Sequence, residues 1–413
     1  MSSGADSTTP SRTAQPRGTR RRRSGLSGWA LLAPLIGLFF ISLTLRPQLV
    51  GIAPLIPQIQ DTFGLSHAAA GLIGTIPVIC MGIFAFPVAW ITRRFGSRNA
   101  MIGAVLLIAV SGALRGLAPN LPLLWLTTVG VGIGIAVAGA LLPVMVKEHF
   151  AHRSGLATGV YATTIQLGTA VSAALAVPIA LAVTWRGTML IFAGAQALFL
   201  VLWLVLQRSH ERVHHVGGTL AAVPIRSALA WYLTAIFTIN AFCFFGLSTW
   251  LPAVLVERGW DDVAAGGALG LLNFAGLPVG ILVPWLADRT DSHRPMLILA
   301  AILVVGGILG VQLDPDLGLL WAFVAGTGLG IIFPTALLLP VGAVDHAADV
   351  SAILALMFGV GYTLSASAPA LLGWVRDVSG SFGTSLWTMV PIAAALIVLA
   401  VTPMPTAEGQ SAA

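Results

Sequence analysis

The sequence predicts an all-α membrane protein in which twelve transmembrane helices form two pseudo-symmetric bundles of six. Its composition, its series of apolar runs and a repeat between its two halves predict this fold. Of the 413 residues, 57% are hydrophobic and 9% are charged, whereas soluble chains carry about 25% charged residues. Long unbroken apolar runs also differ from the alternating strands of about ten residues that build membrane β-barrels. The spans are therefore expected to be helices.

Twelve apolar runs have roughly the length of about 20 residues that a helix needs to cross a bilayer. They run at 28–59, 68–92, 99–117, 122–146, 155–182, 187–207, 229–256, 265–287, 296–313, 318–343, 350–374 and 384–403. The longest gap on the inner side separates the sixth run from the seventh. We therefore expect an N-terminal bundle at 28–207, a linker at 208–228, a C-terminal bundle at 229–403 and a tail at 404–413.

Basic residues are distributed unequally between the two sides of these spans. With the N-terminal tail placed inside, 16 of the 21 Lys and Arg residues fall on the inner side and four on the outer side. This bias predicts that both termini are cytoplasmic and that the chain lies in the cytoplasmic (inner) membrane. Residues 1–27 are expected to be a disordered basic cytoplasmic tail. Six basic residues lie in the N-terminal tail and nearly all the others lie in short gaps between apolar runs, so the net charge of +6 does not indicate nucleic-acid binding.

Residues that enzymes use are not gathered in any recognisable set. All eight histidines fall in loops or at span ends, and Cys80 and Cys243 lie singly within apolar runs. A disulfide framework is not expected from such cysteines. Neither a nucleophile–histidine–acid set nor a metal cluster can be assembled, so we predict no enzyme activity, no metal and no cofactor.

The two halves of the chain repeat each other. The matches that weigh most, at an offset of 195 residues, are Pro57 with Pro252, Trp90 with Trp285 and Arg94 with Arg289. Glycines of the fourth and tenth spans match at an offset of 196. Two parallel repeats of six spans are typical of rocking transporters, which bind substrate between the repeats near the middle of the membrane.

Motifs after the second and eighth spans resemble the inter-span motif G-x-x-x-D-R-x-G-x-x-R of the major facilitator superfamily. Residues 284–294 read Pro-Trp-Leu-Ala-Asp-Arg-Thr-Asp-Ser-His-Arg, and residues 89–98 read Ala-Trp-Ile-Thr-Arg-Arg-Phe-Gly-Ser-Arg. Arg93 stands where an acid is usual, as in the cyanate-permease and nitroimidazole-transporter family of this superfamily. Further similarities are Leu45-Arg46-Pro47, Leu141-Leu142-Pro143, Thr249-Trp250-Leu251-Pro252 and Gly361-Tyr362. The resemblance implies the twelve-helix fold and alternating access, but Thr44 stands where the family usually has Asn, so its substrate does not carry over.

Arg46 is a charged residue deep inside a predicted span, whereas Arg115 lies at the end of one. Arg46 lies about 18 residues, or roughly 27 Å, along the first span, and a cation near mid-membrane costs at least about 2.5–3.5 kcal/mol. No acidic residue inside a predicted span is available to pair with it. Its side chain could snorkel toward the headgroups; alternatively, it binds an anionic substrate through its planar guanidinium. Its counterpart at position 241 is Ala, which gives one positive charge and favours a small monoanion.

Six further polar or aromatic residues lie in spans that flank the central cavity in this superfamily. Each could simply join helices, because such side chains bond between helices in any membrane bundle. As candidate substrate-binding residues we rank Tyr161, Asn240, Trp250 and Asn273 ahead of Gln166 and Tyr362.

Charged residues after the second and eighth spans form two clusters. They satisfy the positive-inside rule, and they could also act as a conformational latch by pairing with neighbouring helix ends in one access state. The cluster residues are Arg93, Arg94, Arg98, Asp288, Arg289 and Arg294. The glycine-rich fourth and tenth spans are expected to allow close helix packing; no Lys-Ser/Thr follows that would make a phosphate loop.

The sequence thus predicts a secondary active transporter that moves a small monoanion or small polar organic solute, cyanate-like, by alternating access. Two alternatives stay open: efflux of a nitroimidazole-like or weakly acidic toxic molecule, and an anion channel. The expected partners are an anionic small-molecule substrate and the lipid bilayer, without nucleic acid, and the protein is expected to be a monomer.

Overall fold

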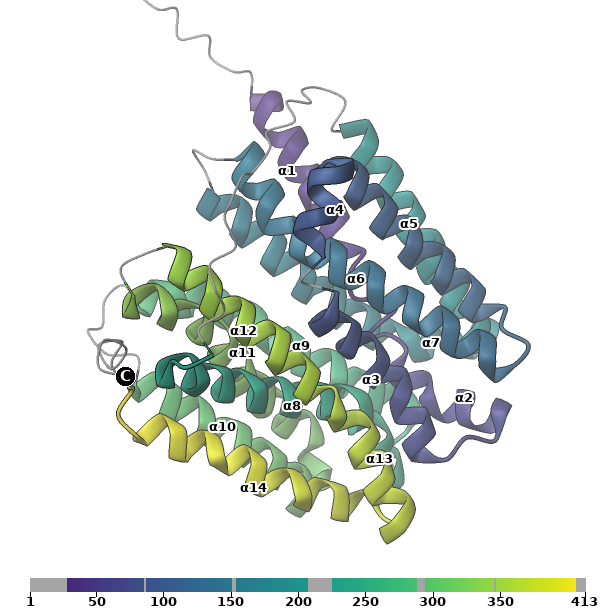
Figure 1. The fold of residues 1–413 in the computed structure, drawn as a ribbon. Coiled ribbons are helices and arrows are strands. Elements are labelled where there is room, and N and C mark those ends of the chain that lie inside the picture. The colour runs from purple at the N-terminus through teal and green to yellow at the C-terminus, as the bar shows by residue number, and fades with distance from the viewer. Residues whose placement is uncertain are drawn as a thin grey trace, which may run out of the picture.

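The computed structural model describes residues 28–84, 87–150, 154–206, 225–287, 294–344 and 347–405. The predictions for the two tails, for most of the linker and for the motif residues Asp288 and Arg289 therefore fall on residues outside these ranges, apart from the first two of the C-terminal tail. Within them the chain is helical, and no strand is assigned (Figure 1).

The N-terminal half begins with a helix that ends in the middle of the first predicted span. Its elements in order are α1 (Gly28–Leu43), η1 (Ala53–Leu55), α2 (Ile56–Phe63), α3 (His67–Ile83), α4 (Val88–Phe95), α5 (Ser97–Gly116), α6 (Leu121–His149) and α7 (Ser154–Leu206). A continuous helix as long as α7 would measure roughly 80 Å, more than twice the hydrocarbon core of about 30 Å. Thr184, at φ 66° and ψ 167°, interrupts it, in the gap predicted between the fifth and sixth spans.

The C-terminal half repeats this plan with a longer first helix. Its elements are α8 (Ala228–Glu257), α9 (Asp262–Ala287), α10 (Arg294–Leu313), η2 (Pro315–Leu317), α11 (Gly318–Ala343), α12 (Ala347–Ser365), α13 (Ser367–Ser379) and α14 (Phe382–Val401). Ala366 separates α12 from α13 inside the eleventh predicted span.

Nine helices in the described ranges are long and apolar enough to cross a membrane, and one of them, Leu156–Leu206, has the length of two crossings. Two shorter apolar helices, Leu32–Leu43 and His67–Ile83, lie in the first and second predicted spans. Each of the twelve predicted runs therefore corresponds to helical structure.

The first predicted span, 28–59, is not one continuous helix, and that expectation is wrong. α1 ends at Leu43, residues 44–52 form turns, and helical structure returns at η1 and α2. Pro47 and Pro54 account for this unwound segment, because each removes a backbone N–H and clashes with the carbonyl four residues earlier.

Glycines let the helices within each half approach closely. A methyl group at Gly132 of α6 would come within 2.7 Å of Pro77 on α3, and one at Gly328 of α11 would come within 2.6 Å of the Ala300 carbonyl oxygen on α10. These contacts confirm that glycines of the fourth and tenth spans serve packing.

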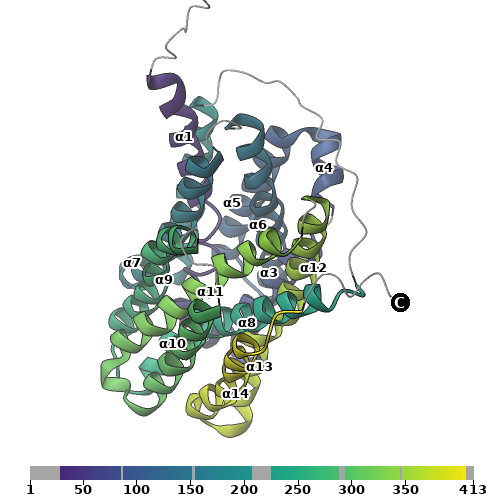
Figure 2. The same cartoon turned by 90° about the vertical axis from the view of Figure 1, so that its left-hand side faces the viewer.

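The two halves form two bundles that are inclined to each other (Figure 1). They meet where α3 packs against α12 and α13, and where α7 packs against α9. A methyl group at Gly71 of α3 would overlap the Pro369 carbonyl of α13. From this meeting point the bundles diverge toward the ends where α1 begins and α14 finishes, and the turned view in Figure 2 shows α8 beside α12 and α13 of its own half.

Candidate functional site between the bundles

Arg46 lies in the unwound segment 44–52, between α1 and η1. Its Nε and Nη1 atoms are buried and have no hydrogen-bond partner among the described residues. The ion pairs found in these residues do not include Arg46. Three side-chain donors on a planar group, held in a segment of turns between two helices, are therefore available to a ligand oxygen or nitrogen.

The backbone carbonyls on either side of Arg46 are bonded by side chains from other helices. Gln196 Nε2 of α7 donates to the Thr44 carbonyl at 2.7 Å, and Arg115 Nη1 of α5 donates to the Gln48 carbonyl at 2.9 Å. In a membrane, irregular backbone is tolerated where protein groups satisfy it or where it lines a cavity. These donors explain how the chain unwinds at this depth.

Tyr362 is a residue of the C-terminal bundle that interacts with Arg46. It lies on α12, and an electrostatic interaction links its hydroxyl to the Arg46 guanidinium. Its ring stacks on Phe358 at 5.8 Å between centroids and meets Phe237 edge-on at 5.1 Å. Arg46 and Tyr362 therefore form a cation and a hydroxyl contributed by different halves, backed by aromatic rings of the C-terminal half.

Asn240 and Asn273 are both buried, and each leaves its Oδ1 atom without a partner among the described residues. Asn240 lies on α8 one turn from Phe237, the ring that contacts Tyr362, so it belongs to the same region of the interface. Asn273 lies on α9, where its Nδ2 donates to the Leu269 carbonyl one turn earlier.

Gln166 and Tyr161 lie on α7. Gln166 reaches the other half, because a methyl group at Gly276 of α9 would stand 2.9 Å from Gln166 Nε2. Tyr161 is partly buried against the main core. The structure thus places Gln166 at the contact between α7 and α9.

Trp250 lies at another place, near the end where the bundles meet. Its Nε1 donates to the Pro369 carbonyl of α13 at 2.7 Å, and its ring lies 5.1 Å from Phe382 and 5.9 Å from His67. The indole is therefore bonded within the protein and belongs to the contact between α8, α13 and α3.

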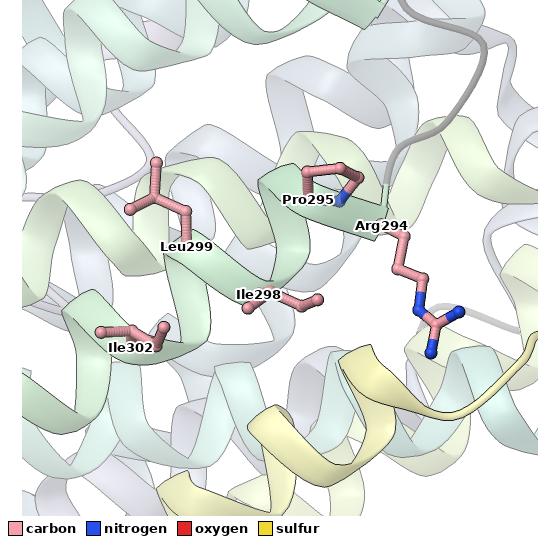
Figure 3. A pocket seen from close by; sticks show the side chains of 5 residues that line it. All are labelled: Arg294, Pro295, Ile298, Leu299 and Ile302. Atoms are coloured by element: carbon pink, nitrogen blue, oxygen red, sulfur yellow. The ribbon is translucent and has the colours of Figure 1, made fainter.

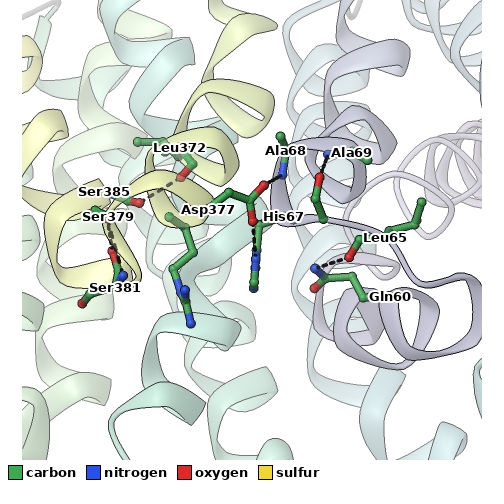
Figure 4. Close-up of polar contacts among 12 residues, drawn as sticks. Gln60, Leu65, His67, Ala68, Ala69, Leu372, Asp377, Ser379, Ser381 and Ser385 are labelled. Atoms are coloured by element: carbon green, nitrogen blue, oxygen red, sulfur yellow. Dashed lines mark hydrogen bonds and ion pairs between the residues drawn. The ribbon is translucent and has the colours of Figure 1, made fainter.

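Sequence reasoning missed a polar contact that joins the two halves. The Asp377 carboxylate of α13 accepts hydrogen bonds from the backbone N–H groups of His67 and Ala68, at 3.0 and 2.8 Å, at the start of α3. His67 Nδ1 lies 2.7 Å from the same carboxylate (Figure 4). Beside it, Arg376 Nε donates to Glu257 at 2.9 Å. The one available signal was that His67 and Asp377 fall at span ends on the same predicted side.

Only some of the predicted latch residues lie within the described ranges. Arg93 and Arg94 are exposed in the last turn of α4, and Arg98 takes part in an interaction at the start of α5. Arg294 Nε donates to the Ala400 carbonyl of α14 at 3.2 Å, within the C-terminal half. Asp288 and Arg289 lie outside the described residues, so the latch stays a prediction.

A surface hollow of about 430 Å³ lies along α10, lined by Arg294, Pro295, Ile298, Leu299 and Ile302 (Figure 3). Leu299 and Ile302 are about half exposed, so this face suits contact with lipid. It is separate from the candidate site, which is formed by Arg46 and Tyr362.

Two inclined bundles of membrane helices, with polar side chains facing each other across their interface, define the class of multi-helix membrane transporters. The profile of the Major Facilitator Superfamily matches residues 32–366, so the chain belongs to this superfamily. It is a membrane transporter and not an enzyme.

Two bacterial relatives narrow this assignment. The chain is 31% identical to the 2-nitroimidazole transporter of Escherichia coli (strain K12) over 88% of this chain and 93% of that protein. It is 30% identical to the cyanate transport protein CynX of the same strain, over 84% and 91%. Within the superfamily the chain therefore belongs with these transporters. A crystal structure of a D-xylose-proton symporter shares the fold at a TM-score of 0.71 with 18% identity, over 92% of this chain and 98% of that one.

Proposed function

We propose that the protein moves a small monoanion of the cyanate type across the membrane by alternating access, with Arg46 as the anion-binding residue. The observation that carries this proposal is the pair of buried, unpartnered nitrogens on the Arg46 guanidinium. A buried cation is costly unless something compensates its charge. A substrate anion would supply that charge and accept the free N–H groups.

The asymmetry of the site supports a monoanion. The counterpart of Arg46 in the C-terminal half is Ala241, and the group of that half that interacts electrostatically with Arg46 is a phenol, the Tyr362 hydroxyl. One positive charge balances one negative charge. The relative named for cyanate transport is consistent with a substrate of this charge and size.

The contacts between the halves support alternating access. Arg46 and Tyr362 come from different bundles, so a substrate that binds both would respond to a change in the angle between them. The Asp377 carboxylate joins the bundles at the start of α3, which the charge bias places on the external side. In this orientation the described state is closed outside and its bundles diverge toward the cytoplasm.

Counterflow in proteoliposomes tests this function. We expect unlabelled cyanate inside the vesicles to accelerate entry of labelled cyanate, because a carrier exchanges substrate across the membrane faster than it returns empty. Vesicles with Arg46→Ala protein are the matched control. Cyanate flux without trans-stimulation would indicate a channel, and absence of flux with cyanate, nitrite and formate alike would reject the small-monoanion proposal.

Export of a nitroimidazole-like molecule is the second candidate. The rings of Tyr362 and Phe358 stack on each other and are only partly buried, and aromatic rings of this kind stack planar heteroaromatic solutes. The relative named as a 2-nitroimidazole transporter agrees with this surface. Counterflow with 2-nitroimidazole in the same vesicles separates the two candidates.

A further inference from the structure

We propose that Gln196 and Arg115 are positioning residues that hold the Arg46 guanidinium in its binding orientation by bonding the backbone on either side of it. The inference rests on the proposed anion site at Arg46. In this proposal, two residues outside the anion site fix the unwound segment that carries Arg46.

The geometry of the four groups is the basis of this proposal. Thr44 and Gln48 stand two residues before and two residues after Arg46, and their carbonyls accept the two side-chain bonds at 2.7 and 2.9 Å. All four residues, Thr44, Gln48, Arg115 and Gln196, have no exposed surface. Water from the bulk therefore cannot replace either donor, and each carbonyl depends on the side chain that reaches it.

The rest of the local bonding is consistent with a fixed segment. The Arg46 carbonyl accepts the backbone N–H groups of Leu49 and Val50 at 3.0 and 2.9 Å. Gln48 Nε2 donates to the Met189 carbonyl of α7 at 3.1 Å. The turn around Arg46 is thus tied to α5 and α7 of its own bundle, and the side chain that remains unbonded is the one facing the other bundle.

The C-terminal half supplies an internal comparison. Its corresponding helix, α8, runs without a break from Ala228 to Glu257, so its carbonyls are bonded within the helix. At offsets of 195 and 196, the counterparts of Arg115 are Gly310 and Val311, and those of Gln196 are Pro391 and Ile392. None of these side chains donates a hydrogen bond. The side-chain donors are therefore present in the N-terminal half, whose first helix unwinds around Arg46. They are absent from the C-terminal half, whose first helix is continuous and has no such cation.

The proposed positioning role also explains why an arginine is buried at position 115. Arg115 is a cation without exposed surface, and its Nε and Nη2 atoms meet no partner among the described residues. A buried cation that is poorly paired does not stabilise the folded protein. Its bond to the Gln48 carbonyl is the contact that explains an arginine at this position.

The test compares binding with folding in seven purified full-length variants. They are Gln196→Leu, Arg115→Met, Arg115→Lys, Arg46→Ala, Arg46→Lys, the double variant Arg46→Lys with Gln196→Leu, and the control Arg186→Met. Arg186 is matched to Arg115 because its Nη1 also donates to backbone carbonyls of the N-terminal half, those of Gly116 and Ala118, at 3.2 and 2.6 Å. Those carbonyls lie at the end of α5 and just after it, and they do not flank Arg46. Cyanate affinity is measured by calorimetry, and melting temperature is measured without ligand.

We expect Gln196→Leu and Arg115→Met to weaken cyanate binding about tenfold each, the scale of one lost buried hydrogen bond. Arg115→Lys should restore part of the affinity, because Lys keeps a charged donor. Arg186→Met should bind cyanate as the wild type does, whatever its melting temperature. In an Arg46→Lys background, Gln196→Leu should cost less than in the wild type, since the planar guanidinium that it orients is no longer present.

Each result has a definite meaning. If Arg46→Ala binds cyanate as tightly as the wild type, the anion site itself is wrong. If Arg46→Ala loses binding while Gln196→Leu and Arg115→Met keep it, the anion site stands and the positioning role is overturned. Equal losses in Arg186→Met and Arg115→Met would also overturn it, because they would show a general effect on the bundle. The positioning role would also be overturned if the losses of cyanate affinity caused by Arg46→Lys and Gln196→Leu were fully additive in the double variant.

Discussion

The first helices of the two halves occupy equivalent places in the repeat and have opposite structures. The N-terminal one is unwound over residues 44–52 around Arg46, whereas α8 continues through the counterpart, Ala241. Both keep the shared proline, Pro57 and Pro252, and Pro252 lies inside α8 without ending it. That shared proline therefore does not cause the break.

Two other prolines distinguish the helices. Pro47 and Pro54 have Phe242 and Thr249 as counterparts, and both counterparts can donate a backbone N–H to the helix. The comparison teaches how the proposed anion site could arise in one half through local changes: two prolines open the backbone, and one arginine lies in the opening. The other half contributes the packed rings of Phe237, Phe358 and Tyr362.

Removing the cation should have the largest effect. Arg46→Ala is expected to cost about 2–5 kcal/mol of cyanate binding, the range for removing one member of a buried hydrogen-bonded charge pair. Arg46→Lys should recover part of this, because Lys keeps the charge and loses the planar fork. Calorimetry with cyanate measures both. Unfolding of the ligand-free Arg46→Ala protein would contradict the account, since it would show that Arg46 has a structural partner.

Adding a cation to the continuous helix should harm folding. Ala241→Arg is expected to lower stability by about 2.5–3.5 kcal/mol, the cost of a central charge in a membrane helix, without creating a second anion site. Thermal unfolding and cyanate stoichiometry measure the two parts, with Ala241→Leu as the control for size. A stable variant that binds two anions would show that the unwound segment is not required.

Converting the unwound segment toward its counterpart should weaken binding moderately. Pro47→Ala combined with Pro54→Thr restores two N–H donors, so the segment can extend as helix and turn Arg46 away from Tyr362. We expect a loss of roughly tenfold, or about 1.4 kcal/mol, in cyanate affinity. Pro57→Ala serves as the control, because the shared proline does not cause the break. Equal effects of both changes would contradict this assignment.

Sequence reasoning recovered the features that depend on composition and repetition. Twelve apolar runs, the repeat and the isolated charge of Arg46 are visible in a single chain. The unwound segment was not visible, because the apolar pattern continues through Pro47 and Pro54 and membrane helices tolerate proline. Contacts made by folding were also hidden: Asp377 and His67 are 310 residues apart, and Trp250 bonds a carbonyl 119 residues away.

Removing the hydroxyl that faces Arg46 should have a smaller effect. Tyr362→Phe keeps the ring contacts with Phe237 and Phe358 and removes one hydrogen-bonding group, so we expect a loss of about 0.5–1.5 kcal/mol in cyanate affinity. Binding of 2-nitroimidazole should fall less than binding of cyanate, because the stacking surface remains. An unchanged cyanate affinity would remove Tyr362 from the site.

Opening the contact between α3 and α13 should affect cyanate binding least. Asp377→Ala removes the carboxylate that accepts the two N–H groups at the start of α3, so the bundles should separate more readily at this end. We expect the rate of cyanate counterflow to change while equilibrium affinity stays close to that of the wild type. A large loss of affinity with an unchanged rate would place Asp377 in the binding site.

The central claim is that the substrate anion sits on the Arg46 guanidinium between the unwound segment and Tyr362. Selenocyanate is a linear monoanion like cyanate, and its selenium atom gives an anomalous X-ray signal. Crystals grown with selenocyanate, after competition with cyanate has been shown in solution, locate it directly. The account predicts a selenium peak beside Arg46 that is lost in crystals of the Arg46→Ala protein. A peak elsewhere, or one that persists in Arg46→Ala, would contradict it.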